Sequence, residues 1–237
     1  MMRATFLLSV LLATGCASLE GPEYGPYDPF EGFNRASYGV SDWVDRNALV
    51  PVARGYQRVT PDWLRDGISN VFLNLITIDS ALNGFLQGKP KRGGTDLARI
   101  ILNSTIGIGG LINAAAQFGL DYQEEDLGQT LAVAGLTRTR YVYIPFAGPS
   151  ALRDIPGRIV RAAIPNLLLG DAYKWWMSGI DLLNSRAQAL SLTDTRDAAA
   201  LDPYAFTREA YYQRRKFLIF DGDPPVDDFF DDFDEDY

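Results

Sequence analysis

The sequence predicts a single all-α domain whose central feature is a glycine-tipped helical hairpin. Removing an N-terminal signal leaves roughly 220 of the 237 residues, enough for one domain with a sizeable core. Apolar residues recur at helical spacing, as at Trp63, Leu64 and Ile68. Residues 100–120 carry no charge at all. These three observations together favour a helical fold.

The uncharged stretch predicts the hairpin. A helix of this length would span the hydrocarbon core of a bilayer, but polar side chains and three glycines interrupt it. We therefore expect two short helices, at about residues 95–104 and 111–118, folded back to back across a glycine turn with positive φ. Such a hairpin is apolar enough to enter a membrane face. The residues also leave open a hairpin buried in the core of a soluble domain.

The N-terminus predicts export. Arg3 is followed by an apolar segment over residues 4–13 and then by small residues, which is typical of a secretory signal. The end of this segment, residues 12–16 (LATGC), resembles a bacterial lipobox. We expect a lipoprotein signal peptide over residues 1–15.

Cys16 is the predicted lipid anchor. It is the only cysteine of the chain and so cannot form an internal disulfide. Acylation gives the thiol a role, because two or more acyl chains anchor a protein stably. The residue after Cys16 is Ala17 and not Asp. In the lipoprotein sorting rule that this motif resembles, the absence of Asp at that position permits export to the outer membrane. Residues 16–27 are expected to form a tether. An ordinary signal peptide with Cys16 as an incidental thiol is the alternative.

Composition excludes several kinds of function. The chain has no histidine, which removes Ser-His-Asp and Cys-His catalysis and histidine metal sites. Residues 221–237 hold nine acidic and no basic residues, and we expect an acidic disordered tail there. Without this tail and Arg3 the charges balance, so no basic face for nucleic acid is indicated. We expect no catalytic residue, no metal and no cofactor.

Caps and breakers place the helices of the first half. A helix carrying Phe33 is expected to end at Pro51. Another begins at residues 60–62 (TPD), with a cap residue, Pro at the first helical position and an acid in the first turn. Asp79 and Ser80 can cap a new helix. The three acids at residues 124–126 fit a helix start, where the helix dipole favours them.

The second half combines one extended piece with helices. Residues 137–146 predict a strand-like segment. Residues 166–192 predict a long apolar helical region whose Trp175-Trp176 pair suits either a bilayer interface or a core. The last helix covers residues 202–215. In that helix we expect Phe206, Ala210 and Tyr211 to face inward and Arg208, Arg214 and Arg215 to face outward.

Several multi-residue motifs occur in the order found in one known family. They are DPFEGFNR (28–35), GISNVFLNL (67–75), NGFLQG (83–88), RIILNSTIGIGG (99–110), EEDLGQTL (124–131), GPSALRD (148–154) and DPYAFTREAYYQRR (202–215). Together they resemble the MlaA (VacJ) family of outer-membrane lipoproteins. That family usually has Glu-Pro at the position of residues 76–79, which are ITID in this chain. The residues that usually kink the helix there are therefore absent.

This resemblance implies a helical, ring- or donut-like domain over residues 28–220, lying in the membrane plane. The protein would be lipid-anchored at the periplasmic face of the outer membrane of a Gram-negative bacterium. Phospholipids misplaced in the outer leaflet would pass through an amphipathic channel to a periplasmic lipid-carrier protein, which maintains lipid asymmetry. The resemblance also implies a complex with a trimeric outer-membrane porin.

The hairpin supplies the expected lipid path. Neutral polar groups lower the cost of moving a charged headgroup through hydrocarbon without holding it tightly. The predicted path consists of Asn103, Ser104, Thr105, Gly107, Gly109, Gly110 and Asn113. The predicted outer, lipid-facing rim consists of Trp63, Phe72, Ile106, Ile108, Leu111, Ile112, Trp175 and Trp176.

Two other classes of function remain open. A structural envelope lipoprotein would use the same anchor without moving lipid. A lipid-modifying enzyme would need a nucleophile or base, and the sequence offers only Ser150 or the carboxylates near Glu125. Ser150 has no histidine and no GxSxG elbow, so a capping or turn role is expected instead.

Overall fold

The computed structural model describes residues 24–170 and 175–225. The predicted signal peptide, Cys16, most of the tether and most of the acidic tail lie outside the described residues. Among the described helices, none combines the length and the apolar character that crossing a membrane requires.

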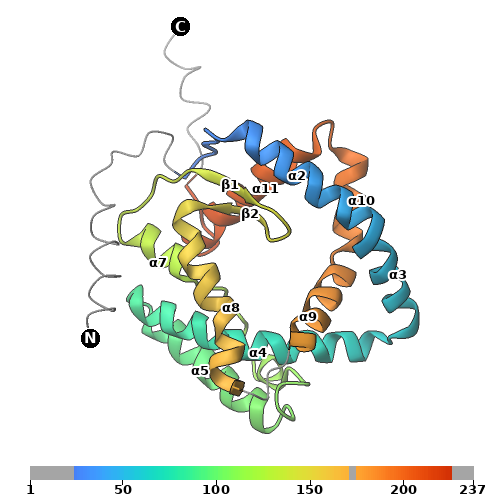
Figure 1. Cartoon of the computed structure of the whole chain (residues 1–237). Coiled ribbons are helices and arrows are strands. Elements are labelled where there is room, and N and C mark those ends of the chain that lie inside the picture. Colours follow the sequence, from blue (N-terminus) through green and yellow to red (C-terminus); the bar gives the residue numbers. More distant parts are fainter. Residues whose placement is uncertain (1–23, 171–174, 226–237) are drawn as a thin grey trace, which may run out of the picture.

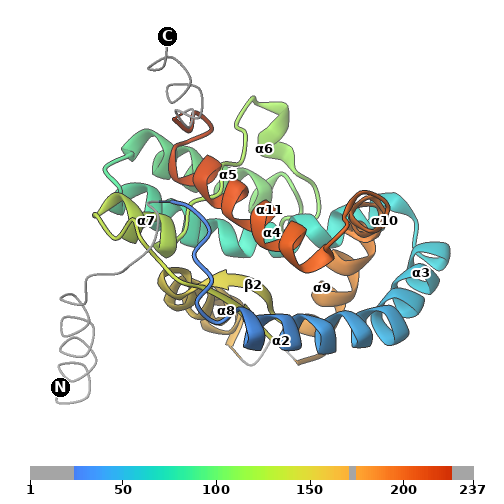
Figure 2. The same ribbon diagram turned by 90° about the horizontal axis from the view of Figure 1, so that it is seen from above.

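The described chain forms a ring (Figure 1). Its elements are α2 (Glu31–Val44), the π-helical turn η2 (Asp45–Leu49), α3 (Val50–Val59), α4 (Asp62–Leu86), α5 (Pro90–Thr105), α6 (Ala114–Gln117), α7 (Leu127–Val133), β1 (Tyr141–Ile144), β2 (Gly148–Ala151), the 3-10 turn η3 (Leu152–Asp154), α8 (Ile155–Leu169), α9 (Trp175–Gln188), α10 (Leu190–Ala199) and α11 (Pro203–Ile219). The arc of α2, η2 and α3 closes one side of the ring, α4 crosses below, and α8 lies opposite α9. Figure 2 shows α6 projecting from one face.

The domain is mostly helical, as predicted, but it is not all-α. The predicted extended segment forms β1, which pairs antiparallel with β2 so that Tyr141 lies opposite Ala151 and Ile144 opposite Gly148. Alternation along β1 buries Tyr141 and Tyr143 on one face, which is the pattern of a half-buried strand.

Pro51 does not end the first helical segment. It lies in the first turn of α3, directly after a π-helical turn whose shifted hydrogen-bond pattern accommodates a residue without a backbone N–H. The preceding turn η2 is π-helical, and the N–H of Val50 bonds to the carbonyl of Asp45. This wider turn carries the chain from α2 into α3 without a break.

Two other predicted helix limits were wrong. Asp79 and Ser80 start no new helix, because α4 continues through both residues as one helix of 25 residues. Without the Glu-Pro pair, nothing at residues 76–79 interrupts its hydrogen bonds. The region 166–192 is not one helix, since α8 ends before Gly170, which has a φ of +51°, and α9 and α10 follow.

The predicted hairpin is present in its first arm and its turn. After α5 the chain turns through residues 106–113, and Gly109 and Gly110 have the positive φ that was expected. The second arm is only α6, whose four residues are capped by the Asn113 side chain. The long partner of α5 is α4, which runs against it.

Buried tyrosines join the first and last helices to the strands. Tyr38 of α2, Tyr141 and Tyr143 of β1, and Tyr204 and Tyr212 of α11 form one cluster. Their rings meet mostly edge to face, with Tyr38 and Tyr143 5.4 Å apart. In α11 these tyrosines face inward, whereas Phe206 and Ala210 are exposed, contrary to the prediction.

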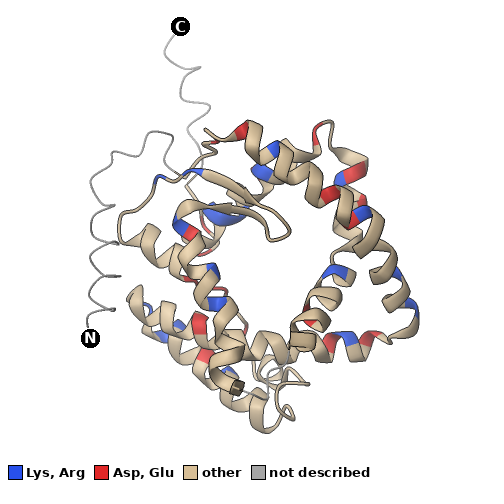
Figure 3. Ribbon diagram, in the orientation of Figure 1, with Lys and Arg blue, Asp and Glu red and all other residues tan. Residues whose placement is uncertain are grey.

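Ion pairs close the ring where the arc meets α9 and α10, and Figure 3 shows acidic and basic positions interleaved there. Arg186 binds Asp45 through two bonds, Nε to Oδ1 at 2.6 Å and Nη2 to Oδ2 at 2.7 Å. The other pairs at this seam are Arg46–Asp197, Arg196–Asp42 and Arg54–Asp194. Charge pairs thus contribute to holding the arc at this seam.

The two ends of the described chain meet. The ring of Tyr24 lies 4.9 Å from that of Phe220, edge to face. Asp221 pairs with Lys89 at 2.6 Å and with Arg92 at 2.5 Å. The ordered body therefore extends beyond residues 28–220 at both ends.

Candidate functional site

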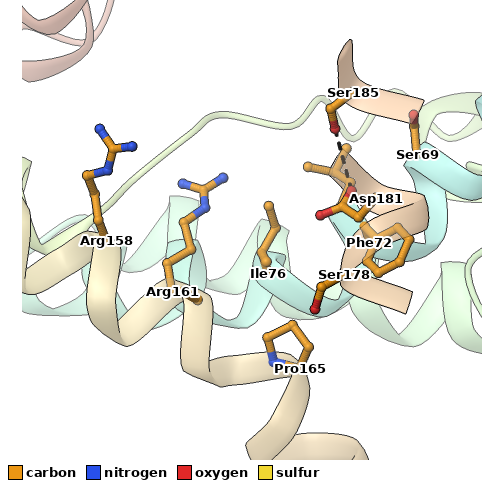
Figure 4. A pocket seen from close by; sticks show the side chains of 11 residues that line it. Ser69, Phe72, Ile76, Arg158, Arg161, Pro165, Ser178, Asp181 and Ser185 are labelled. Atoms are coloured by element: carbon orange, nitrogen blue, oxygen red, sulfur yellow. Dashed lines mark hydrogen bonds between the residues drawn. The ribbon is translucent and has the colours of Figure 1, made fainter. Parts of the chain in front are cut away.

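A cavity of about 620 Å³ lies between α4, α8 and α9, within the range of small-ligand sites. Its lining consists of Ser69, Phe72, Leu73, Ile76, Arg158, Arg161, Ala162, Pro165, Ser178, Asp181 and Ser185. Figure 4 shows the two arginines projecting side by side from α8, with Asp181 and Ser185 across from them and Ile76 between. The cavity has a basic side, an acidic side and an apolar floor.

Arg158 carries an uncompensated charge on the basic side. Its Nη1 donates to the carbonyl oxygen of Pro149 at 2.6 Å, and its Nη2 donates to that of Ala147. Carbonyls orient the guanidinium without neutralising it. No ion pair joins Arg158 to another residue of the described ranges.

Arg161, one helical turn later, is only partly neutralised. Its Nη1 bonds to Oε1 of Glu124 at 2.9 Å, and the same carboxylate also pairs with Arg214 at 2.6 Å. The single negative charge of Glu124 is thus shared between Arg161 and Arg214. Proline at position 165 lacks an N–H, so the carbonyl of Arg161 has no helical donor at the face that lines the cavity.

Asp181 forms the acidic side. Burial raises the pKa of this carboxyl, and a hydrogen bond from Ser185 Oγ, at 3.5 Å, only partly offsets the effect. Within residues 24–170 and 175–225 it has no cation within ion-pair distance. A desolvated carboxylate of this kind is stabilised by any cation that reaches it.

Asn184, one turn from Asp181, fixes α9 against its neighbours. It is fully buried and accepts from the Tyr56 hydroxyl at 2.9 Å. Its Nδ2 donates to the carbonyl of Arg65 at 3.1 Å and to Ser69 Oγ at 2.7 Å. Because α3, α4 and α9 are tied at one point, the α4 and α9 walls of the cavity keep their spacing.

The predicted lipid-path residues lie elsewhere, at the C-terminal end of α5 and on the turn that follows it, and none of the seven lines this cavity. Asn103, Gly107 and Gly110 are buried, and Ser104, Thr105 and Gly109 are exposed. Their polar groups mainly build the turn. Asn103 Oδ1 accepts the N–H of Ala115 at 2.9 Å.

Two asparagines of α4 hold this turn in place. Asn74 Nδ2 donates to Ser104 Oγ at 2.9 Å, and Asn70 Nδ2 donates to the carbonyl of Leu111 at 3.2 Å. Asn113 caps α6 and accepts a long bond from Arg99. The turn is thus a small structure of its own on the outer side of α4.

The predicted rim is exposed in seven of its eight members. Trp63, Ile106, Ile108, Leu111, Ile112, Trp175 and Trp176 are all exposed. Phe72 is half-buried and lines the cavity instead, because it lies on the face of α4 that α8 and α9 approach. The assignment of Phe72 to the outer rim was therefore wrong.

The two residues considered for an enzyme are both fully buried. Ser150 lies within β2 rather than in a turn or cap. Glu125 accepts from Lys89 at 3.1 Å and from Arg92 at 2.5 Å, and its other oxygen accepts from Gln87. Asp126 beside it caps α7 by accepting the N–H of Gln129, as expected for an acid at a helix start.

The sequence profile of the MlaA lipoprotein family matches residues 26–218. The chain belongs to the MlaA lipoprotein family. It is 35% identical over 224 residues to the intermembrane phospholipid transport system lipoprotein MlaA of Shigella flexneri, covering 91% of this chain and 88% of that protein. The MlaA protein of Escherichia coli (strain K12) is 34% identical over the same shares, and that of Haemophilus influenzae is 29% identical over 92% of this chain.

One solved structure also resembles this fold. It comes from work on the structural basis for maintenance of bacterial outer membrane lipid asymmetry, and it aligns with a TM-score of 0.70 and 34% identity. The alignment covers 81% of this chain and 98% of that chain. The family assignment made from the motifs is confirmed.

The MlaA-family motifs mostly hold the ring together. Asp28, from the first motif, accepts from Asn34 at 2.7 Å and from the hydroxyl of Tyr204 in the last motif. It also accepts from Arg208 at 3.4 Å. Arg215, predicted to face outward, is buried between Asp126 and Asp154. These residues close the ring around the cavity rather than line it.

Ser69, Phe72 and Leu73 belong to the motif at residues 67–75, but the charged residues of the cavity lie outside the motifs, which is why motif reasoning missed them. One signal was available. Arg158 and Arg161 are three residues apart on one face of an otherwise apolar helix that also contains Pro165. Charged side chains on such a helix are expected to reach solvent or a polar partner.

Proposed function

We propose that this MlaA-family lipoprotein removes misplaced phospholipids from the outer leaflet of the outer membrane and passes them toward the periplasm, which maintains lipid asymmetry. The names of the Shigella flexneri and Escherichia coli relatives support a place in intermembrane phospholipid transport. The similar solved structure, which concerns maintenance of outer-membrane lipid asymmetry, supports the same role.

The distribution of side chains supports a body that lies in lipid. Among the described residues, 19 buried side chains are polar or charged and 15 are apolar, while 33 large apolar side chains are exposed. A protein surrounded by water shows the opposite tendency. Because no described helix can cross a membrane, the ring would lie in the plane of the inner leaflet rather than span the bilayer.

The cavity between α4, α8 and α9 is the observation that carries the proposal. It combines an apolar floor of Phe72, Leu73 and Ile76 with polar groups at its sides. Acyl chains would contact the floor while the headgroup meets the charged sides. A phospholipid is amphipathic in this same way, so the cavity lowers the cost of taking its headgroup out of water.

The turn after α5 is a second possible path. The exposed Ser104, Thr105 and Gly109 are neutral, and exposed apolar side chains such as Ile106 and Ile108 flank them. The proposal of the seven turn residues as a lipid path therefore stands beside the cavity, and one experiment separates the two.

That experiment obstructs each proposed path by substituting one of its residues with tryptophan. Ile76→Trp fills the cavity, Thr105→Trp enlarges the turn, and Ile101→Trp, on the exposed face of α5, is the matched control. In cells whose native copy is deleted, outer-leaflet phosphatidylethanolamine is labelled with an amine-reactive dye that does not cross membranes. If the cavity is the path, Ile76→Trp leaves several-fold more surface label than wild type, while the other two variants do not.

Protein amount and thermal midpoint are measured for all three variants, so that loss of protein is not mistaken for loss of transport. A strong effect of Thr105→Trp alone would move the path to the turn. If well-folded Ile76→Trp and Thr105→Trp both cleared the surface normally, a structural lipoprotein would be the better interpretation.

We also propose that the protein is anchored through Cys16 and works with a trimeric porin and a periplasmic lipid carrier. The exposed apolar surface provides contact area for a membrane protein partner. Extraction of the full chain in mild detergent, followed by mass spectrometry, should recover phospholipid and a porin. A sample without porin would remove that partner, and an unmodified Cys16 would remove the anchor.

A further inference from the structure

We infer that the cavity prefers zwitterionic phospholipids whose headgroup carries a primary ammonium group, with Arg158 holding the phosphate and Asp181 holding the ammonium. This inference rests on the proposed function, because it assumes that a phospholipid enters the cavity. It adds the class of headgroup and the two side chains that distinguish it.

The basic side suits a phosphate. Arg158 is half-buried and is oriented by two backbone carbonyls, and no described carboxylate pairs with it. A planar guanidinium held in this way presents its remaining N–H groups to phosphate oxygens. Arg161 adds a second positive charge that it shares with Arg214 over one carboxylate.

The acidic side suits an ammonium. Asp181 is half-buried, and within the described part of the chain it accepts one long hydrogen bond, from Ser185. The arginines of the cavity project from the opposite wall. Transfer of a carboxylate out of water is costly unless a cation accompanies it. The ammonium group of a headgroup supplies that cation, whereas a glycerol headgroup supplies only hydroxyls.

The spatial order of basic, apolar and acidic side chains in the cavity suits a single phospholipid molecule. Figure 4 places Ile76 of α4 between the arginines and Asp181, so an apolar surface separates the two charged sides. Phosphatidylglycerol would satisfy Arg158 through its phosphate, but its glycerol would bring only neutral hydroxyls toward Asp181. The cavity therefore discriminates by leaving Asp181 unpaired with the wrong headgroup.

The test measures which lipid the full-length protein takes from mixed vesicles. Protein in mild detergent is incubated with vesicles of equimolar phosphatidylethanolamine and phosphatidylglycerol, repurified, and its bound lipids are quantified by mass spectrometry. We expect phosphatidylethanolamine to be enriched about 3- to 10-fold, the effect of one charge-assisted hydrogen bond. Equal amounts, or enrichment of phosphatidylglycerol, would overturn the inference.

Substitutions then assign the preference to Asp181. Asp181→Asn keeps the shape and should reduce the ratio to about 1 while total bound phospholipid is retained, and Asp181→Lys should favour phosphatidylglycerol. Asp194→Asn, at an exposed carboxylate of α10, is the matched control and should keep the wild-type ratio. An unchanged ratio in folded Asp181→Asn would contradict the assignment.

Two further outcomes separate this inference from the proposed function. If no phospholipid is bound above a blank without protein, the proposed function fails as well. If phospholipid is bound without a preference, only the inference fails. Free phosphoethanolamine at millimolar concentration should not displace the lipid, and displacement would mean that the site recognises the soluble compound instead.

Discussion

Gly128 lets two buried charges meet because it has no side chain. A Cβ at this position would lie 2.2 Å from Oδ1 of Asp154 and 2.8 Å from Nη2 of Arg215. Arg215 Nη2 bonds to that Asp154 oxygen at 3.0 Å. Burial opposes ionisation of neighbouring Asp126, but its bonds with Arg215 lower its pKa to about 2. The glycine of the EEDLGQTL motif is therefore explained by close approach.

Gly128→Ala should destabilise the protein by about 2–4 kcal/mol, because it separates a buried ion pair. Gly94→Ala is the matched control. Gly94 is helical, and a Cβ there would meet nothing within 4 Å, so this change should stabilise α5 by about 0.5–1 kcal/mol. Chemical unfolding in detergent measures both. Equal effects of the two substitutions would contradict the close contact at Gly128.

The raised pKa of Asp79 predicts that the free energy of unfolding depends on pH. Burial raises its pKa from 3.8 to about 6, so the folded state binds a proton more tightly than the unfolded state. The stabilisation from this proton is complete below pH 4 and is lost as the pH rises through about 6. Asp79→Asn keeps an acceptor for Asn83 and should stabilise the protein at pH 8 by about 1–3 kcal/mol.

The gain should vanish at about pH 3, below the unfolded pKa of 3.8, where Asp79 is mainly protonated in both states. Asp66→Asn, at an exposed position of α4, provides the comparison and should change stability little at either pH. A gain from Asp79→Asn that persists at about pH 3 would mean that the carboxyl keeps an ordinary pKa.

At the level of elements, the arc of α2, η2 and α3 depends on charge pairs at its seam with α9 and α10. The buried apolar cluster between α3 and the other side is small: it consists of Ala53, Ala187 and Leu190, with Val50, Tyr56 and Leu183 packed against it. The Arg186–Asp45 pair is the most enclosed, with side chains 12% and 22% exposed. Attachment of the arc should therefore respond to changes in these few charges.

A double-mutant cycle with Arg186→Ala and Asp45→Ala should give a coupling energy of about 1–2 kcal/mol, since the pair is bidentate and partly buried. The Arg54–Asp194 pair crosses the same seam at 3.5 Å with both side chains more than half exposed. Its coupling should stay below about 0.5 kcal/mol. Unfolding followed by tryptophan fluorescence gives both values, and equal couplings would show that burial has no influence here.

Local sequence signals found some elements and missed others for physical reasons. The cap and proline at residues 60–62 placed the start of α4 to within one or two residues, and the Asp202 cap placed α11. Pro51 misled because a π-helical turn accommodates it, and no single-residue propensity reveals such a turn. Arg215 was placed outward because its partners, Asp126 and Asp154, come from distant segments.

At the level of the whole molecule, all four tryptophans of the chain are exposed. Trp43, Trp63, Trp175 and Trp176 have 66%, 72%, 87% and 50% of their surfaces accessible. In a water-soluble domain these large apolar side chains would usually be covered. Their exposure fits the proposal that this surface faces lipid headgroups and acyl chains.

Tryptophan fluorescence of the reconstituted protein should therefore be quenched by brominated phospholipids and protected from aqueous acrylamide. The expected emission is blue-shifted relative to the denatured protein. Variants that retain one tryptophan each would show which side of the ring lies deepest. Efficient acrylamide quenching of every single-tryptophan variant would mean that the ring stays in water.

The site was less predictable than the fold. The motifs identified the family because they are contiguous in sequence, and they lie where distant segments lock together, as at Asp28 and Tyr204. The cavity instead takes a few residues from each of three helices, α4, α8 and α9. Nothing in one sequence shows that Arg158 and Asp181 face one cavity, because that fact belongs to the packing of helices.

The stacking of Tyr24 on Phe220 also sets a length. The body is fixed from Tyr24 onward, and Cys16 precedes it by eight residues. A fully extended chain spans at most about 3.3–3.6 Å per residue, so eight residues reach roughly 28 Å. If Cys16 carries the lipid anchor proposed above, this segment is shorter than a bilayer is thick. An anchored body could then tilt or rotate at the membrane surface but could not cross the periplasm, and that step would fall to the proposed lipid carrier.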